Sequence, residues 1–389
     1  MSSARRTLGE AHRLVIKLGT HVVTRDGVEL ALPRLEGLIA SIARLRQSGR
    51  EVVLVSSGAV GMGMRVLGLK ERPRSLGLRQ ACAAVGQGHL MSAYTKAFAA
   101  LGLTAAQVLL TQEDLGDRDR ALCVRTTLMR LLQLGTVPVL NENDSVSVRE
   151  LVEHQRLLGV AQEAPVFGDN DGLSAQVAVS LDADLLILLT NVDGVFTASP
   201  AVDPTAIRIR ELSVVDDEAL ARTAGFSNGG TGGMASKLEA ARLAVAEGTT
   251  VVVANGTADG IIDRVLAGED LGTLIPAAEK RKARWRHIAT SARAQGALVV
   301  NGGALKALGE RKASLLPIGV VAVEGTFEQG DVVEIRDGSG RVHGRGLVNY
   351  DAEACRRLAG HRSDEIDVLL GYRSYDALIT RDNLVMGAI

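Results

Sequence analysis

The chain has 389 residues, a formal net charge of −1, 46% hydrophobic residues and only 3% aromatic residues. Its length allows two or three domains with substantial cores. The balanced charge and the few aromatic side chains argue against a protein that binds single-stranded nucleic acid or an acidic membrane.

The three cysteines are far apart in the sequence, without a C-x-x-C motif. This spacing argues against a disulfide framework or a zinc site and for a reducing compartment. The N-terminus has no apolar signal segment, and no apolar run is long enough to span a membrane. We therefore expect a cytoplasmic protein without a membrane partner.

The first predicted strand covers residues 13–18 (RLVIKL) and ends at Gly19. Lys17 is a charge inside this apolar run. An edge strand would leave the lysine in water, whereas a central strand would turn it toward a ligand. We favour the central strand, because open parallel sheets bind their ligands at the carboxyl ends of their strands.

A helix over residues 33–48 and a strand over 51–55 follow, and the strand runs into small residues at 56–61 (SSGAVG). A strand, a glycine turn and a helix together form an anion-facing turn in βα units. Ser57 is therefore a candidate ligand group, although a serine that caps the helix would explain the pattern equally well.

A long helix is predicted over residues 75–100, and we interpret Cys82, Gln87 and His89 within it as packing or surface residues. The same reasoning predicts a strand over residues 105–110, a helix over 117–134 and a strand over 136–140.

Two polar clusters follow. Residues 141–144 (NEND) come directly after the strand at 136–140, where Asp144 could accept hydrogen bonds from an amino group. Residues 168–171 (GDND) precede a helix that we expect from 172 to about 181. Asn170 suits a helix cap, whereas Asp171 lies past the cap and could orient a lysine.

The strand at 184–189 ends in Thr190 and Asn191, and a glycine-rich run follows at 227–237 (SNGGTGGMASK). Glycines let the backbone approach a ligand, and free N–H groups at a helix start bind anions. We expect Lys237 to be exposed in the first turns of the helix 234–247, where it could meet a phosphate. The run is not a P-loop, because no G-x-x-x-x-G-K-[ST] pattern occurs.

A strand over 250–254 and a helix over 259–266 complete the alternation. Alternating strands and helices predict an α/β fold, a mostly parallel sheet covered on both faces. The segment 279–295 is basic and is interpreted as a linker between domains at 1–278 and 296–389.

Four short β runs follow the linker, at 297–300, 319–324, 331–336 and 341–348. They are separated by glycine turns such as 301–303, which predicts a small β-barrel. This module is close to neutral, which speaks against RNA as its partner.

Several motifs resemble those of glutamate 5-kinases, which belong to the amino acid kinase family. The motifs are VIKLGT at 15–20, VSSGAV at 55–60, NEND at 141–144, GDND at 168–171, LLTNVDGVF at 188–196 and GTGGMASK at 230–237. In the last hundred residues SLLPIG at 314–319, AGH at 359–361 and EIDVLLGY at 365–372 resemble a PUA domain.

The resemblance implies an αβα sandwich that transfers the γ-phosphoryl group of ATP to the side-chain carboxylate of L-glutamate, with Mg²⁺ carried by ATP and no metal site on the protein. It assigns catalysis to Lys17, Asp171 and Lys237. The implied glutamate-binding residues are Ser57, Asp144 and Asn170, and the implied nucleotide-binding residues are Lys17, Thr190, Asn191, Thr231, Gly232, Gly233, Met234, Ala235, Ser236 and Lys237.

The resemblance also implies feedback inhibition by proline, a homo-oligomer (dimer or tetramer) and a partner dehydrogenase that consumes the product. Asn191 stands where some members have aspartate, and the segment 150–166 is longer than usual beside the expected glutamate site. The alternatives are another acid-phosphorylating member, such as an acetylglutamate or aspartate kinase, and an RNA-binding regulator.

Overall fold

The chain forms two compact units, residues 1–277 and 278–389. The linker expected at 279–295 falls almost wholly outside the residues that the structure describes. Among the described helices, none combines the length and apolar character needed to cross a lipid bilayer. The computed structural model describes residues 3–73, 75–146, 170–200, 202–217, 219–220, 233–277, 294–310, 313–373 and 375–387.

The first unit is built on a seven-stranded sheet of order β5-β6-β4-β1-β7-β8-β9. Every neighbouring pair is parallel except β8 with β9. The central position of β1 confirms that Lys17 does not lie on an edge strand. The strands are β1 (Arg13–Leu18), β4 (Glu51–Ser56), β5 (Ala105–Leu110), β6 (Val137–Glu142), β7 (Leu185–Thr190), β8 (Thr250–Asn255) and β9 (Thr273–Ile275), and β2 (Thr24–Arg25) pairs with β3 (Glu29–Leu30).

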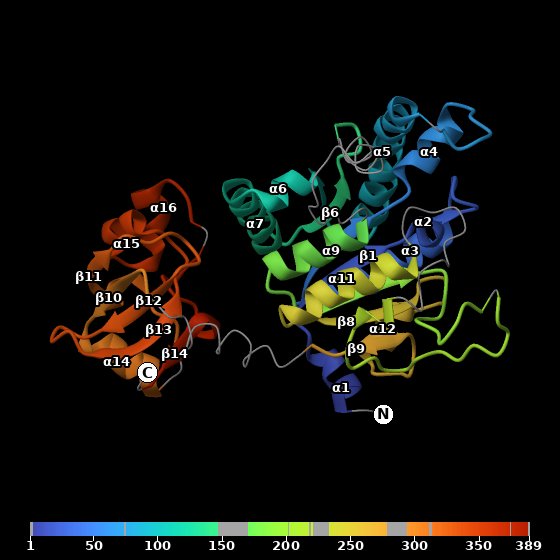
Figure 1. Cartoon of the computed structure of the whole chain (residues 1–389). Coiled ribbons are helices and arrows are strands. Elements are labelled where there is room, and N and C mark those ends of the chain that lie inside the picture. Colours follow the sequence, from blue (N-terminus) through green and yellow to red (C-terminus); the bar gives the residue numbers. More distant parts are fainter. Residues whose placement is uncertain are drawn as a thin grey trace, which may run out of the picture. The chain divides into compact units, whose positions relative to one another are not determined.

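Helices cover both faces of this sheet (Figure 1). Successive residues of a strand point to opposite faces, so Leu14 and Ile16 pack in one core and Val15 in the other. The first core contains α3 (Leu32–Gln47), α5 (Leu76–Ala99) and α12 (Ile261–Leu266); the second contains α7 (Arg118–Gln133), α9 (Asn170–Ser180) and α11 (Met234–Ala246). Shorter helices are α1 (Ser3–Arg6), η1 (Thr7–Glu10), α2 (Thr20–Val23), α4 (Ala59–Val66) and α6 (Gln112–Gly116).

Strands β6 and β7 extend into the polar clusters that were predicted to follow them. Asn141 and Glu142 belong to β6 and pair with Leu109 and Leu110 of β5, and Thr190 is the last residue of β7. The prediction ended these strands too early. Hydrophobic periodicity detects apolar side chains, whereas the backbone hydrogen bonds between strands also form at polar residues. The polar groups are thus held on the sheet itself.

The second unit is a five-stranded sheet of order β11-β10-β12-β13-β14. The four predicted β runs are confirmed, but β10 and β12 are parallel, and the two outer strands do not pair with each other among the described residues. The sheet is therefore open and mixed, where a barrel was predicted. Its strands are β10 (Gly296–Val300), β11 (Val320–Gly325), β12 (Val332–Arg336), β13 (Val342–Leu347) and β14 (Leu384–Met386).

The predicted turn at 301–303 is wrong, because a helix begins at Gly302. The Oδ1 atom of Asn301 accepts a hydrogen bond from the Ala304 N–H at 2.8 Å, as a helix cap does. Helices also supply part of the core, with Leu308 and Leu358 buried. The helices are α14 (Gly302–Glu310), η2 (Pro317–Gly319), α15 (Ala352–Leu358), η3 (Ser363–Glu365), α16 (Ile366–Leu370) and η4 (Arg381–Asn383).

Candidate active site

A cavity of ≈ 470 Å³ lies at the carboxyl ends of β1, β4, β6 and β7. This is the edge at which a parallel sheet is expected to bind its ligand. The cavity collects predicted residues from motifs far apart in the sequence. Those that line it are Lys17, Ser57, Asp144, Asn170, Thr190, Asn191 and Lys237.

Beside the cavity, two lysines share one buried carboxylate. Lys17 Nζ lies 2.6 Å from Asp171 Oδ1, and Lys237 Nζ lies 3.0 Å from Asp171 Oδ2. Asp171 is 0% exposed, Lys17 4% and Lys237 5%. We call these three residues the lysine–aspartate cluster. Two ammonium groups and one carboxylate leave it with a net charge of +1.

Each member of the cluster comes from a different element. Lys17 is on the same face of β1 as Val15, toward α9 and α11. Asp171 lies in the first turn of α9, where the helix dipole favours a carboxylate. Lys237 lies in the first turn of α11, and the prediction that it is exposed is wrong. Alanines of α9 and α11 lie in one buried core cluster, and Lys237 is buried with them.

The Asp171 carboxyl group is ionised in this setting. Burial by itself would raise its pKa, but the neighbouring ammonium groups of Lys17 and Lys237 lower it by more, and the pKa lies well below its usual range. The carboxylate therefore holds the two lysines in place without neutralising both.

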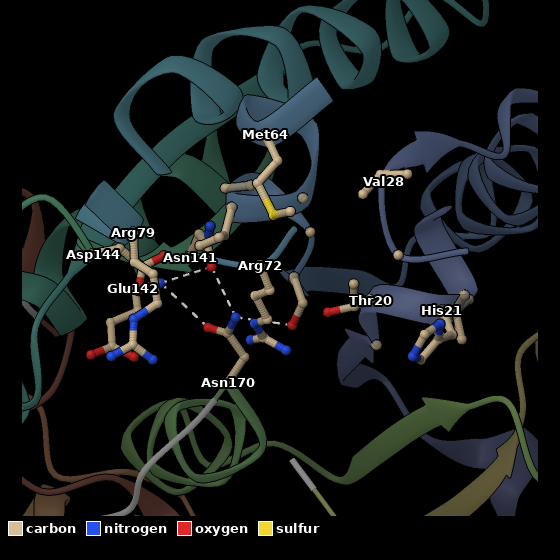
Figure 2. Close-up of a pocket in the computed structure, with 18 of the residues that line it drawn as sticks. Thr20, His21, Val28, Met64, Arg72, Arg79, Asn141, Glu142, Asp144 and Asn170 are labelled. Atoms are coloured by element: carbon tan, nitrogen blue, oxygen red, sulfur yellow. Dashed lines mark hydrogen bonds between the residues drawn. The ribbon is translucent and has the colours of Figure 1, made fainter. Parts of the chain in front are cut away.

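A second, uncharged group of residues lies on the β4–β6 side of the cavity. Asn170 Nδ2 donates to Ser57 Oγ at 3.0 Å, to Asn141 Oδ1 at 2.9 Å and to the Ser56 carbonyl at 3.2 Å. The Glu142 N–H donates to Asn141 Oδ1 at 3.0 Å and to Asn170 Oδ1 at 3.3 Å. The bonds among Asn141, Glu142 and Asn170 are drawn in Figure 2. We call Ser57, Asn141 and Asn170 the amide cluster.

Asn141 was not singled out from the sequence. It lies in the polar run that pointed to Asp144, but nothing in the run distinguishes the residue that faces its neighbours from those that face water. The structure buries Asn141, with only 3% of its surface exposed, whereas Asp144 is half-buried at the cavity wall.

Three basic side chains of the cavity wall were also missed: Lys70, Arg72 and Arg79. In Figure 2, Arg79 lies beside Asp144 and Glu142. For Lys70 and Arg72, the basic composition of residues 70–74 (KERPR) was the available signal. It matches no motif, and a charged segment between helices usually faces solvent.

The turn after β4 requires glycine at two positions. Gly58 has φ +110°, in the left-handed region where a side chain would be strained. A Cβ atom at Gly61 would lie 1.8 Å from the Gly27 carbonyl oxygen. The start of α4 is therefore packed directly against the backbone at Gly27, and both glycines line the cavity.

Comparisons with known proteins identify the family of the chain. The amino acid kinase family model matches residues 12–255, and the PUA domain model matches residues 296–370. The chain belongs to the amino acid kinase family. Glutamate 5-kinase of Moorella thermoacetica is 46% identical over 385 residues, which are 98% of each chain. Those of Myxococcus xanthus and Thioalkalivibrio sulfidiphilus are 44% and 45% identical over 388 residues, covering 99% of this chain and 99% and 100% of theirs.

This member of the amino acid kinase family is thus a kinase of the glutamate 5-kinase group that carries a PUA domain. Part of its predicted nucleotide side lies outside the described residues, namely Thr231 and Gly232. The long segment at 150–166 lies outside them as well. Gly233, Met234, Ala235 and Ser236 are at the start of α11 but are not among the residues that line the cavity.

Thr190 and Asn191 place the end of β7 at the cavity wall. Thr190 is buried and its Oγ1 donates to Asn191 Oδ1 at 3.4 Å, while Asn191 is exposed. Ser236 has a different role. Its Oγ donates to Asp171 Oδ2 at 3.1 Å and to the Gly233 carbonyl at 2.9 Å. It contacts the lysine–aspartate cluster rather than the cavity.

Proposed function

We propose that this protein phosphorylates the side-chain carboxylate of L-glutamate with ATP, the first step of proline synthesis. A carboxylate oxygen of glutamate forms a bond to the γ-phosphorus, and the bond from that phosphorus to the β–γ bridging oxygen breaks. The products are glutamyl 5-phosphate and ADP. The carboxylate is already ionised at neutral pH, so no proton has to be removed and no general base is required.

The lysine–aspartate cluster is the observation that supports this reaction. The chemical difficulty is to bring two anions together and to stabilise the charge on the transferred phosphoryl group. A net charge of +1 beside the cavity meets that need, and its burial strengthens each electrostatic interaction. We assign Lys17 and Lys237 to the phosphoryl group and Asp171 to the positioning of both.

We assign recognition of glutamate to the β4–β6 side of the cavity. Ser57 and Asn170 offer a hydroxyl and an amide, and Asp144 offers a carboxylate for the α-ammonium group. We assign ATP to the β7 side, where Thr190 and Asn191 line the cavity. The two substrates then meet at Lys17, on the central strand between these sides.

ATP also brings the metal ion in this proposal. Mg²⁺ is usually held by phosphate oxygens and water with one or two carboxylates, rather than by a cage of protein ligands. Among the described residues, no group of three or more His, Cys, Asp or Glu side chains could hold a metal ion. Mg²⁺ would neutralise phosphate charge, while the chain's own residues orient the two substrates.

Three further properties rest on the similarity to glutamate 5-kinases alone: inhibition by proline, assembly into a homo-oligomer and a cytoplasmic location beside a dehydrogenase that consumes the labile acyl phosphate. Proline shares the ammonium and carboxylate groups of glutamate but lacks its side-chain carboxylate. We expect proline to raise the apparent KM for glutamate and to leave the KM for ATP unchanged. Initial rates at several proline concentrations test this.

The reaction itself is tested by an acid-specificity assay. The purified protein is incubated with ATP, Mg²⁺ and glutamate, aspartate or N-acetylglutamate, and ADP formation and hydroxylamine-trapped acyl phosphate are both measured. We expect product with glutamate. Phosphorylation of aspartate or N-acetylglutamate without glutamate would contradict the proposed substrate, and no phosphorylation of any acid would contradict the proposed reaction.

A further inference from the structure

Gln87 lies behind the amide cluster, on α5, and is not among the residues that line the cavity. The sequence indicated a packing or surface residue. In the structure its Oε1 accepts a hydrogen bond from Asn141 Nδ2 at 2.8 Å. Asn141 in turn contacts Asn170, which lines the cavity. Gln87 is thus the outer end of a chain of three carboxamides.

Backbone groups at both ends determine which direction of this chain satisfies every hydrogen bond in it. The Glu142 N–H can only donate, and it points to Asn141 Oδ1, so Asn141 Nδ2 must turn the other way, toward Gln87. At the inner end, the Ser56 carbonyl can only accept, and it faces Asn170 Nδ2 at 3.2 Å. Position 87 must therefore present an acceptor.

The orientation of Asn170 decides which of its polar atoms meets a ligand. Its Nδ2 is turned to Asn141, Ser56 and Ser57. Its Oδ1 is on the side of Glu142, the same side as Asp144 in Figure 2. Beside the guanidinium group of Arg79, this part of the wall therefore carries oxygen acceptors, which suit an ammonium group. A reversed amide would present N–H donors and repel it.

We propose that Gln87 is a positioning residue that fixes Asn141 and, through it, Asn170, and thereby sets the preference of the cavity for an acid with a free α-ammonium group. This inference rests on the proposed function, since it names how the same cavity distinguishes its substrate. Gln87 does not touch the substrate. It supplies the acceptor for Asn141 Nδ2.

The test is a series at position 87 in the full-length protein. Gln87→Glu keeps an acceptor, Gln87→Met keeps the length with only a weak acceptor, and Gln87→Lys replaces the acceptor by a donor. We expect the KM for glutamate to stay within about threefold of wild type in Gln87→Glu and to rise roughly tenfold in Gln87→Met. In Gln87→Lys it should rise further. The KM for ATP should not change.

Glutarate, which is glutamate without its amino group, provides the decisive comparison. If Gln87 acts through the ammonium site, Gln87→Met lowers the kcat/KM for glutamate about tenfold and leaves that for glutarate nearly unchanged. A purely structural role would lower both alike. The controls are His89→Glu, His89→Met and His89→Lys, which make the same chemical changes on the exposed side of the same helix.

The outcomes separate this inference from the proposed function. A wild-type protein that does not phosphorylate glutamate overturns both. An active wild type overturns the inference alone if Gln87→Met binds glutamate as well as Gln87→Glu does, or if the selectivity for glutamate over glutarate is unchanged. Thermal unfolding establishes that each variant is folded, and if Gln87→Lys is not, the pair of Glu and Met variants decides.

Discussion

The two sides of the cavity are built on different physical principles. The lysine–aspartate cluster is charged, buried and assembled from one strand and two helix starts. The amide cluster is uncharged and consists of directional hydrogen bonds between side chains and two backbone groups. One side attracts any anion, and the other distinguishes donors from acceptors.

This difference gives the two sides of the cavity separate roles in phosphoryl transfer. Charge acts over several ångströms and falls off slowly, so a lysine stabilises a moving phosphoryl group throughout its transfer. A hydrogen bond weakens steeply when its geometry changes, so it suits recognition of a group that stays still. We therefore expect changes in the charged cluster to affect kcat and changes in the amide cluster to affect the KM for glutamate.

The largest effect is expected from Asp171→Asn, because it removes the negative charge that two buried ammonium groups share. Removing one partner of a buried ion pair typically costs about 3–5 kcal/mol of stability. Urea unfolding should show a loss of that size together with near-complete loss of activity. Asp217→Asn is the control, since its ion pair with Arg242 is exposed. A stable, active Asp171→Asn protein would contradict the role of the carboxylate.

Lys237→Ala should come next and act on catalysis. The loss of one preorganised charge at the phosphoryl group should lower kcat by roughly 10²–10³-fold, while the KM for glutamate changes little. Steady-state kinetics measure both constants. Arg242→Ala removes a cation further along α11 and should leave both near wild type. A change confined to KM would mean that Lys237 contributes only to binding.

The dependence of stability on pH provides a further contrast between the two clusters. The folded protein holds the pKa of Asp171 below that of the unfolded chain, because the two ammonium groups outweigh the effect of burial. The stabilisation is therefore complete above the unfolded value of about 3.9 and is lost as the pH falls toward the folded value.

The difference in unfolding free energy between wild type and Asp171→Asn should thus be constant near neutral pH and shrink below about pH 4. Urea unfolding at pH 7 and at pH 3.5 measures it. The corresponding difference for Asn141→Ala should not depend on pH, because no charged group is lost. A difference for Asp171→Asn that is equal at both pH values would contradict this account.

The sequence predicted all three members of the lysine–aspartate cluster but only Ser57 and Asn170 of the amide cluster. Lys17 stood out as a charge in an apolar strand, and Asp171 and Lys237 lie in polar motifs at helix starts. A charged residue inside an apolar run can be recognised from the sequence alone, because burying it without a partner costs free energy. The parallel sheet with helices on both faces could also be predicted. Strands and helices that alternate along the chain, each with an apolar face to bury, can pack together in only a few ways.

The contact between Gln87 and Asn141 could not be predicted in the same way. Gln87 and Asn141 are 54 positions apart, and a neutral amide is equally common on a surface. Their contact depends on the way α5 crosses the sheet, which no local pattern encodes. The burial of Lys237 and the open form of the C-terminal sheet were missed for the same reason: both depend on how elements pack against each other.

Within the amide cluster, Asn141→Ala should raise the KM for glutamate roughly tenfold and lower kcat much less. The change leaves the Glu142 N–H and Asn170 Nδ2 without one of their acceptors, and the loss of such a bond corresponds to about 1–2 kcal/mol. Steady-state kinetics with glutamate varied at saturating ATP measure it. Asn143→Ala, in the same polar run, is the control. An equal fall in kcat would place Asn141 with the charged cluster.

The smallest effect is expected from Ser236→Ala, which tests whether the lysine–aspartate cluster depends on hydrogen-bond geometry. The Ser236 hydroxyl donates to the same Asp171 oxygen that Lys237 contacts. With two ammonium groups already on the carboxylate, loss of one neutral hydrogen bond should cost about 1 kcal/mol or less and lower kcat only a few-fold. Ser174→Ala is the matched control, because Ser174 Oγ donates to the backbone carbonyl of Asp171 and not to its carboxylate. A loss for Ser236→Ala as large as that for Lys237→Ala would show that the cluster depends on hydrogen-bond geometry as the amide side does, and the division between charge and direction would then fail.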